Sequence, residues 1–467
     1  MTPDGWLWGT VATDVAVASY ADGDALTTRQ RQRLARLLAA AKERSPFYRR
    51  VLRRCDTHRA ALSELPVIHK AELMQHFDEW VADPAIRLDA LRRFVADRRR
   101  IAEPFLDSYV VWESSGSSGE PGIYVQDDLA LAVFDALEAV RRPMLRPARR
   151  MFDPWGWGER IAFVGATDGH FASTVSIERL RRLNPALAQR LRCISFMQPV
   201  EAIVKAIDAM APSVIATYPS AAVLLAEERL HGRMRTAPYD VWTGGENLYP
   251  SERVFIQRAF HCSVADSYGA SEFLSLAFEC EKGALHLNSD WAILESVDEQ
   301  QRPVPHGETG ATVLLTNLAN HVQPLIRYDL GDRITVHARG CTCGSRLPVI
   351  EVEGRCEDTL CIEGDDATSV RLLPLALSTA IEDGAELFDF QLVQQGPRDL
   401  LMRTGLQGSE AELALRKARH ALRAFLRSQG VTGVQIECRA GEPGHAGRSG
   451  KVPRVVAAGG TAVLTAP

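Results

Sequence analysis

The sequence predicts an α/β protein, with a large N-terminal part that contains parallel strands and a smaller α+β part at the C-terminus. Between residues 161 and 290, short apolar runs alternate with helical stretches, which is the pattern of parallel strands joined by helices. The pattern is β-rich from 285 to 353, and from about 357 it mixes strands with two helices. A chain of 467 residues is long enough to form more than one core.

Composition excludes several classes of protein. Hydrophobic residues make up 46% and charged residues 24% of the chain, which is typical of a globular protein and not of a fibrous or disordered one. The net charge of −5 argues against nucleic acid or an anionic membrane as the main partner. No apolar run reaches the ~18 residues of a membrane span, and no signal peptide is visible. Nine scattered cysteines fit a reducing compartment, so we expect a cytoplasmic location.

The first expected helix covers residues 27–54, with Thr27 and Thr28 as caps and Pro46 as a break. Its apolar positions recur at helical spacing: Leu34, Leu37, Leu38 and Ala41. Its basic side chains fit a solvated helix face better than a nucleic-acid contact: Arg29, Arg31, Arg33 and Arg36.

The rest of the chain follows in order. The pattern predicts a strand at 109–112, a Ser/Gly loop at 114–119 and a helix at 129–140. The alternating region is expected to hold strands at 161–165, 214–217, 241–243 and 263–268, and helices at 200–210, 219–231 and 250–260. The β-rich region is expected to hold strands at 291–297, 311–316, 333–337 and 349–352, and the tail is expected to hold helices at about 371–382 and 409–428.

The loop at residues 114–122 reads Ser-Ser-Gly-Ser-Ser-Gly-Glu-Pro-Gly. Glycines let backbone N–H groups converge on an anion, and serine hydroxyls donate hydrogen bonds to phosphate oxygens. A flexible surface loop would have the same composition. The position of this loop between a strand and a helix favours phosphate binding, although no Gly-Lys-Ser/Thr of a Walker loop follows.

Further segments follow this loop in a fixed order. They are Thr243-Gly244-Gly245-Glu246, Asp266-Ser267-Tyr268-Gly269-Ala270-Ser271-Glu272, Arg327-Tyr328-Asp329-Leu330-Gly331-Asp332, Gly354-Arg355-Cys356-Glu357-Asp358 and Gly447-Arg448-Ser449-Gly450-Lys451-Val452-Pro453-Arg454. Together with the early segments Ser45–Tyr48 and Leu65–Lys70, this order resembles the adenylate-forming superfamily over nearly the whole chain. The resemblance is strongest to its phenylacetate-CoA ligase branch.

The resemblance implies an enzyme that uses ATP to convert a small, aromatic carboxylic acid into an acyl-adenylate, releases pyrophosphate and transfers the acyl group to coenzyme A. It implies Mg²⁺ as a cofactor, a homodimer, an N-terminal adenylation domain at 1–356 and a mobile C-terminal domain at 357–467 with Glu357 at the hinge. Two alternatives stay open. One is the same adenylation with an amine, a carrier-protein thiol or another nucleophile as acceptor, and the other is a non-catalytic nucleotide-binding relative.

By the same resemblance, ATP would be bound by three groups of residues. The phosphate group comprises Ser114, Ser115, Gly116, Ser117, Ser118 and Gly119. The adenine group comprises Gly244, Gly245, Glu246, Asp266, Tyr268, Gly269 and Ser271, although Tyr268 would also fit an ordinary core. Asp332 would bind the ribose hydroxyls, whereas Asp329 is expected to form the turn around Gly331. Relatives often carry a lysine where this chain has Glu120.

Three residues are candidates for catalysis. Lys451 would reach the α-phosphate and the carboxylate together in the transition state. Glu272 would bind Mg²⁺, and Arg355 would reach the ribose or a phosphate. Without the flanking motifs, Lys451 would be read as part of a mobile tail loop and Glu272 as a surface or helix-capping acid.

The acid pocket is expected by analogy around five residues: Trp155, Trp157, Phe163, Tyr218 and Ser267. Aromatic walls suit an aryl or arylalkyl acid. Ordinary core packing would explain the same residues equally well.

A second candidate site comprises Cys280, His286, Cys341 and Cys343. Three thiols and one imidazole are a complete tetrahedral ligand set for a structural zinc ion. Cys-x-Cys is tighter than the usual Cys-x₂-Cys, so ordinary buried or surface thiols are the alternative. Cysteines at similar places in some phenylacetate-CoA-ligase-like proteins favour zinc.

Overall fold

A nine-stranded sheet forms the centre of the protein, in the order β13-β14-β9-β8-β7-β6-β5-β3-β4. The computed structural model describes residues 5–57, 62–114, 121–142, 158–337, 340–353, 359–364, 369–444 and 453–457. Helices and parallel strands alternate along the sequence as predicted, and the mixed α/β fold class is confirmed.

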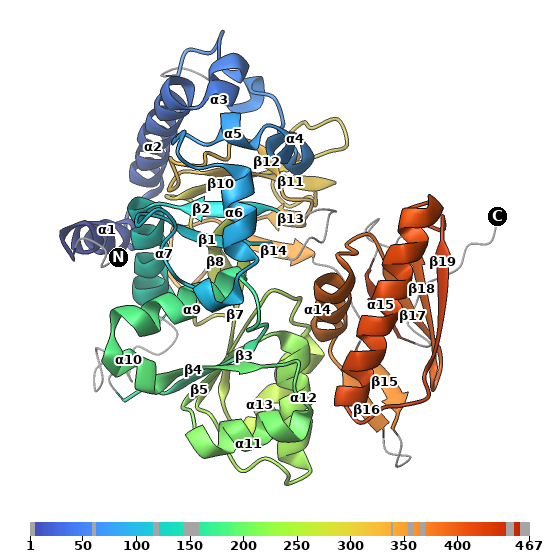
Figure 1. Ribbon diagram of the computed structural model, residues 1–467. Helices are drawn as coiled ribbons and strands as arrows, with labels where there is room; N and C mark the ends of the chain where they lie inside the picture. Colours follow the sequence, from blue (N-terminus) through green and yellow to red (C-terminus); the bar gives the residue numbers. More distant parts are fainter. Residues whose placement is uncertain are drawn as a thin grey trace.

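Five strands form the parallel half of this sheet. They are β3 (Ile161–Gly165), β4 (Leu191–Ser195), β5 (Val214–Thr217), β6 (Asp240–Gly244) and β7 (Ser263–Ala270). Their helices are α9 (Ala172–Leu183), α10 (Pro185–Arg190), α11 (Val200–Met210), α12 (Pro219–Leu230) and α13 (Pro250–Phe260). Figure 1 shows α9 and α10 on one side of these strands and α11 to α13 on the other. Since parallel strands end at one edge of a sheet, the loops after β5, β6 and β7 meet there.

The predicted β-rich region forms antiparallel strands. β8 (Phe273–Glu279), β9 (Leu285–Leu287), β13 (Arg333–Val336) and β14 (Val349–Glu353) complete the large sheet. A separate sheet comprises β10 (Ala292–Val297), β11 (Thr312–Asn317) and β12 (Tyr328–Asp329). The candidate phosphate loop connects a hairpin made of β1 (Val110–Glu113) and β2 (Ile123–Gln126).

The N-terminal region is helical. Its elements are α1 (Gly5–Ser19), α2 (Gly23–Arg44), α3 (Pro46–Val51), η1 (Leu62–Glu64), α4 (Lys70–Gln75), α5 (Phe77–Trp80), α6 (Leu88–Val95), η2 (Arg98–Arg100) and α7 (Asp128–Arg141). None of the helices in the described ranges is long and apolar enough to cross a membrane.

The predicted bounds of the first basic helix were wrong at both ends. Asp22 caps α2, because its side chain accepts a hydrogen bond from the backbone N–H of Ala25 at 2.8 Å, so the helix begins before Thr27. It ends at Arg44, and Ser45 then caps α3 by accepting from the backbone N–H of Tyr48 at 3.2 Å. The predicted apolar face is confirmed, since three of its four residues are buried: Leu37, Leu38 and Ala41.

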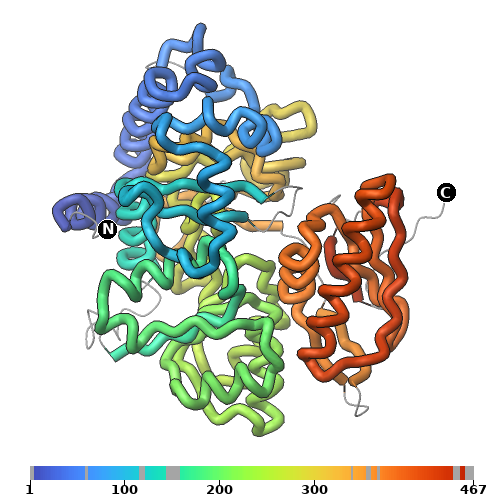
Figure 2. The backbone as a smooth tube through the Cα atoms, in the orientation of Figure 1, coloured from blue at the N-terminus to red at the C-terminus, as the bar shows by residue number. Residues whose placement is uncertain are grey.

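Residues from 359 onward form a group of elements to one side of the large sheet (Figures 1 and 2). The group contains the hairpin β15 (Leu360–Glu363) and β16 (Ser369–Leu372), the sheet β17 (Gln391–Gly396), β18 (Asp399–Thr404), β19 (Gln435–Ala440) and β20 (Val455–Val456), and the helices α14 (Pro374–Ala385) and α15 (Gly408–Ser428). The helix predicted from 371 begins only at Pro374, because residues 369–372 pair as strand β16. The proposed hinge at Glu357 lies outside the described residues.

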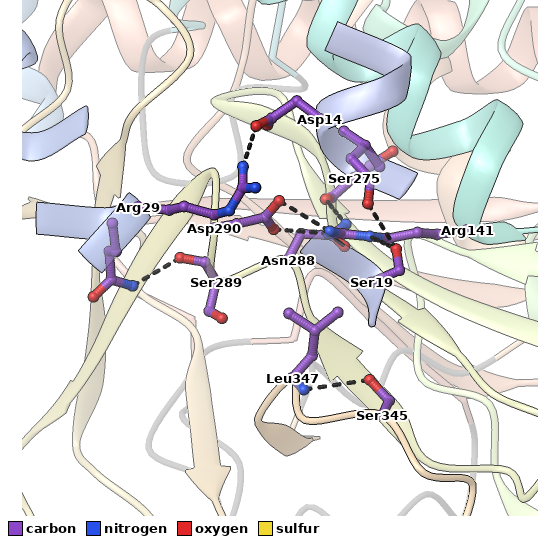
Figure 3. Close-up of polar contacts among 12 residues, drawn as sticks. Asp14, Ser19, Arg29, Arg141, Ser275, Asn288, Ser289, Asp290, Ser345 and Leu347 are labelled. Atoms are coloured by element: carbon purple, nitrogen blue, oxygen red, sulfur yellow. Dashed lines mark hydrogen bonds and ion pairs between the residues drawn. The ribbon is translucent and has the colours of Figure 1, made fainter. Parts of the chain in front are cut away.

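A buried arginine connects the N-terminal helices to the sheets (Figure 3). At the end of α7, the Arg141 guanidinium donates to the two carboxylate oxygens of Asp290 at 2.8 and 2.9 Å, and neither side chain is exposed. Its Nη1 also donates to Asn288 Oδ1 at 2.5 Å, and its Nε donates to Ser19 Oγ in α1 at 3.1 Å. Asn288 in turn donates to the backbone carbonyl of Ser275 in β8 at 2.6 Å. The network therefore joins α1, α7, β8 and the chain after β9.

We expect Asp290→Ala to lower the free energy of unfolding by about 3–5 kcal/mol, because it leaves the Arg141 guanidinium buried without its counter-ion. Urea denaturation followed by circular dichroism measures the change. Glu412→Ala, which removes the exposed partner of Arg416 in α15, should leave the curve almost unchanged. Equal curves for the two variants would contradict the structural importance of the Arg141 pair.

Candidate active site

A cavity of about 1700 Å³ lies where the loops after β5, β6 and β7 meet, and α7, α9 and α14 also line it. It brings together the described members of the predicted nucleotide and acid sites: Ser114, Phe163, Tyr218, Gly244, Gly245, Glu246, Asp266, Ser267, Tyr268, Gly269, Ser271, Glu272 and Asp332. Residues that are far apart in the sequence therefore line the same cavity, as the order of the motifs led us to expect.

The remaining predicted site residues lie outside the described residues: Ser115, Gly116, Ser117, Ser118, Gly119, Glu120, Trp155, Trp157, Arg355, Glu357 and Lys451. Ser114 marks the base of the candidate phosphate loop. Its backbone N–H donates to the carbonyl of Gly122 at 2.9 Å, and its Oγ accepts from the N–H of Gly122 at 2.9 Å. These two contacts hold the ends of the loop beside the cavity.

Two glycines in the cavity wall leave no room for a side chain. Gly245 has a φ of +80°, and a Cβ there would lie 2.9 Å from the ring of Tyr218. A Cβ on Gly269 would lie 1.9 Å from the backbone oxygen of Leu274, across the irregular β7–β8 hairpin. Packing against the Tyr218 ring and within the β7–β8 hairpin therefore requires glycine at both places.

The loop after β6 is fixed by Glu246. Its carboxylate accepts hydrogen bonds from the backbone N–H of Ser220 at 3.0 Å and from Ser220 Oγ at 3.1 Å, at the start of α12. A carboxylate at this end of a helix also interacts favourably with the helix dipole. Through this contact, Glu246 holds the predicted adenine loop against the start of α12.

Tyr268 and Asp332 contact each other in the cavity. The Tyr268 hydroxyl donates to Asp332 Oδ2 at 2.9 Å, so the predicted adenine-side residue holds the predicted ribose-side residue. Burial, and then the Asp332 charge, raise the pKa of Tyr268 well above its usual value. Asp329 forms the turn as predicted, because its Oδ1 accepts from the backbone N–H of Gly331 at 2.9 Å.

Glu272, the predicted magnesium ligand, is held by two tyrosines that the sequence did not single out. Glu272 Oε1 accepts from the hydroxyl of Tyr124 at 2.5 Å and from that of Tyr328 at 2.9 Å. Both tyrosines are buried, and burial followed by the Glu272 charge raises the pKa of each hydroxyl well above its usual value. Both phenols therefore stay protonated and act as donors. Tyr328 lies inside a recognised motif, whereas no local signal marks Tyr124.

Asp266 and Ser267 lie in β7, directly before Tyr268 in the sequence. Asp266 Oδ1 accepts from Thr243 Oγ1 at 2.8 Å, and burial raises the pKa of Asp266 to about 6 against the effect of that hydrogen bond. The Ser267 hydroxyl donates to the backbone carbonyl of Thr243 at 3.0 Å. These contacts join β6 and β7 between the nucleotide side and the predicted acid pocket.

The predicted zinc ligands also come together, at the far end of β8. The ligand atoms of Cys280, His286, Cys341 and Cys343 all lie within 4.8 Å of one another. The two sulfurs of Cys280 and Cys341 are 3.7 Å apart, and Cys343 Sγ is 3.3 Å from His286 Nε2. Four ligands about 2.3 Å from a central zinc ion would be roughly 3.8 Å apart, so these separations fit a tetrahedral site.

The surroundings of the Cys/His cluster support the same geometry. His286 Nδ1 lies 3.0 Å from the backbone oxygen of Leu347, which leaves Nε2 directed toward the sulfurs. Backbone N–H groups of Lys282 and Cys343 donate to the sulfurs of Cys280 and Cys341 at 3.4 and 3.5 Å. The cluster joins β8, β9 and the chain that leads into β14.

Comparison with known proteins gives a relative in sequence and several solved structures of similar fold. No protein-family profile matches the chain. The chain is 26% identical over 372 residues to phenylacetate-coenzyme A ligase of Thermus thermophilus, which covers 75% of this chain and 76% of that protein.

Solved structures have the same fold. The chain resembles a 2-hydroxyisobutyryl-CoA ligase in complex with 2-HIB-AMP and CoA in its thioesterification state, with a TM-score of 0.57, 20% identity, and coverage of 94% of this chain and 91% of that one. The TM-score with that ligase in the postadenylation state is 0.53, at 20% identity, covering 94% of this chain and 90% of the other. The chain is thus similar in sequence to a phenylacetate-coenzyme A ligase and has the fold of solved CoA ligases, and the motif order and the cavity that gathers it agree with this similarity.

Proposed function

We propose that this protein is an ATP-dependent ligase that converts a small carboxylic acid into an acyl-adenylate, releases pyrophosphate and transfers the acyl group to coenzyme A. The observation that carries the proposal is the single cavity in which Gly245, Tyr268, Glu272 and Asp332 meet. The phenylacetate-coenzyme A ligase that resembles this chain, and the CoA ligase structures with an acyl-AMP, support it.

In the first step, the acid carboxylate attacks the α-phosphorus of ATP and the bond to pyrophosphate breaks. The protein has to orient the two reactants and stabilise negative charge as it moves onto the leaving group. In the proposed arrangement the close backbone at Gly245 receives the purine beside Tyr268, and Asp332 accepts hydrogen bonds from the ribose hydroxyls.

Glu272 fits a magnesium ligand, because Mg²⁺ prefers carboxylate oxygens and the two tyrosine hydroxyls orient this carboxylate. Bound there, the ion would neutralise charge on the phosphates. Lys451 and Arg355 would add cationic donors at the α-phosphate and the ribose. In the second step, we propose that residues 357–467 turn about Glu357 so that the CoA thiol can reach the acyl-adenylate.

The function is tested by ATP–pyrophosphate exchange over a panel of carboxylic acids, followed by product mass spectrometry with and without CoA. We expect acid-dependent exchange and, with CoA, the mass of an acyl-CoA thioester. Exchange without a thioester would point to another acceptor, and ATP binding without exchange for any acid would reject the ligase assignment.

Lys451→Ala should lower the exchange rate by roughly 100-fold or more, because a donor to developing charge in the transition state is lost. The measurement is initial-rate pyrophosphate exchange at saturating acid. Lys417→Ala, in the exposed part of α15, is the matched control and should keep the wild-type rate. An unchanged rate in Lys451→Ala would reject its catalytic role.

Tyr124→Phe should lower exchange roughly tenfold and shift its Mg²⁺ dependence to higher concentration, since a hydrogen bond to a charged group contributes about 1.5–3 kcal/mol. A magnesium titration of the exchange rate separates this positioning effect from a general loss of activity. Tyr109→Phe removes another tyrosine hydroxyl, which donates to Asp83 at 2.7 Å outside the cavity, and should leave the titration unchanged. Identical titrations for all three proteins would contradict the role of Tyr124.

We further propose that the Cys280, His286, Cys341 and Cys343 cluster binds one structural zinc ion. All four positions are supplied by protein ligands, so no coordination site is left for substrate or water. The ion would fix β8 and β9 to the chain before β14.

Purified protein should contain about one zinc ion per chain. Cys341→Ser should lose most of it and melt at a clearly lower temperature, because binding energy at a structural site is folding energy. Metal analysis and thermal melting, with the exposed Cys361→Ser as control, test this. Zinc-free wild-type protein that is stable in the presence of a chelator would exclude the site.

A further inference from the structure

The segment Leu65–Lys70 runs beside strand β12 and brings two basic side chains to the cavity. Ile68 pairs in parallel with Tyr328. The backbone N–H of Ile68 donates to the carbonyl of the residue before Tyr328, and its carbonyl accepts from the N–H of the residue after it, both at 3.0 Å. The next two residues of the segment, His69 and Lys70, both line the cavity. A segment that has so far been given no role therefore forms part of the cavity wall.

The pairing brings Lys70 close to the residues predicted to hold the ribose and the magnesium ion. His69 Nδ1 lies 3.4 Å from Asp329 Oδ2, so the two segments stay side by side one residue beyond the paired position. Lys70 follows at the level of the turn that leads to Asp332. The hydroxyl of the paired tyrosine donates to Glu272 at 2.9 Å.

The reach of a lysine covers the distance between these places. Extended chain advances about 3.3 Å per residue, so the Lys70 backbone lies roughly 7 Å beyond the position that pairs with β12. A lysine side chain extends about 6 Å from its Cα atom. Asp332 and Glu272 line the same cavity as Lys70. The ammonium group is therefore within reach of a ligand that lies between these two carboxylates.

The other charges of the cavity explain why a lysine is useful at this place. Glu272, Asp329 and Asp332 all line this wall, and their carboxylates would repel the phosphates of ATP unless cations lay nearby. Four arginines of the cavity form ion pairs with carboxylates: Arg142 with Glu138, Arg179 with Asp135, Arg371 with Glu227, and Arg454 with Glu382. Their charges are thus largely neutralised within the protein. A lysine ammonium is a compact charge with three hydrogen-bond donors, which suits phosphate oxygens.

We propose that Lys70 binds a phosphate group of ATP. This inference rests on the proposed ligase function, in which ATP is the co-substrate. The polyphosphate extends from the ribose, proposed at Asp332, toward the magnesium ligand Glu272, so it passes the part of the wall that carries Lys70. Hydrogen bonds between an ammonium and phosphate oxygens are charge-assisted and stronger than neutral ones.

The test compares Lys70→Met with the wild-type protein. Removal of the ammonium should weaken the binding of ATP with Mg²⁺, measured by calorimetry without acid, by roughly 10- to 100-fold, because a charge-assisted hydrogen bond is lost. In pyrophosphate exchange, the KM for ATP should rise by a similar factor, whereas the KM for the acid should stay within about twofold, because the acid does not contact the lysine.

Two further variants separate the phosphate contact from a general effect on the fold. Lys70→Arg keeps a cation and should bind ATP to within about threefold of the wild-type affinity. Lys205→Met removes a lysine that is exposed on α11, outside the cavity, and should bind ATP as the wild-type protein does. Melting temperatures of all three variants show whether the fold is retained.

Unchanged ATP affinity in Lys70→Met would overturn the inference. An equal rise in the KM for the acid would also overturn it, because the lysine would then lie at the substrate carboxylate. ATP binding by the wild-type protein without exchange for any acid would instead reject the ligase function, and the calorimetric comparison would still decide whether Lys70 contacts ATP.

Discussion

The contacts of the buried Arg141 guanidinium are those on which both the joining of the N-terminal helices to the sheets and the cavity depend. A charge removed from water is tolerated only when its hydrogen-bonding groups are satisfied, and here Nε, Nη1 and Nη2 all have partners. Because Arg141 ends α7, the same contacts fix the helix that presents Asp135 and Glu138 to the cavity.

A chain of hydrogen bonds continues from Arg141 to the wall of the cavity. Asn288, which accepts from Arg141, donates to the carbonyl of Ser275, and the Ser275 hydroxyl donates to Glu138 at 2.5 Å. The carboxylates of the cavity are then held in two different ways. At the predicted nucleotide side, tyrosine hydroxyls hold Glu272 and Asp332 by hydrogen bonds. On α7, by contrast, Glu138 and Asp135 form ion pairs with Arg142 and Arg179.

The sequence was a good guide where local pattern decides the structure. The apolar runs at 161–165 and 214–217 are buried parallel strands, and the helix at 250–260 has the predicted bounds, because period and length distinguish such elements. Tyr218 and Gly245 share one cavity because they follow the neighbouring parallel strands β5 and β6. The start of α2 was missed because Asp22 was not considered as a cap.

Pairings over long sequence distances could not be predicted in this way. Tyr124 contacts Glu272 over 148 residues, and Arg141 contacts Asp290 over 149. No periodicity or spacing encodes such partners, since the side chains meet only after the sheets have formed. For the same reason, the approach of Lys70 to the cavity could be recognised only in the folded protein.

Strand β8 connects the cavity to the Cys/His cluster. Glu272 directly precedes it and Cys280 directly follows it, so one extended segment of roughly 25 Å separates the proposed magnesium ligand from the Cys/His cluster. The strand pairs with β7 on one side and with β9 on the other, so the sheet holds the backbone that lies between these two places.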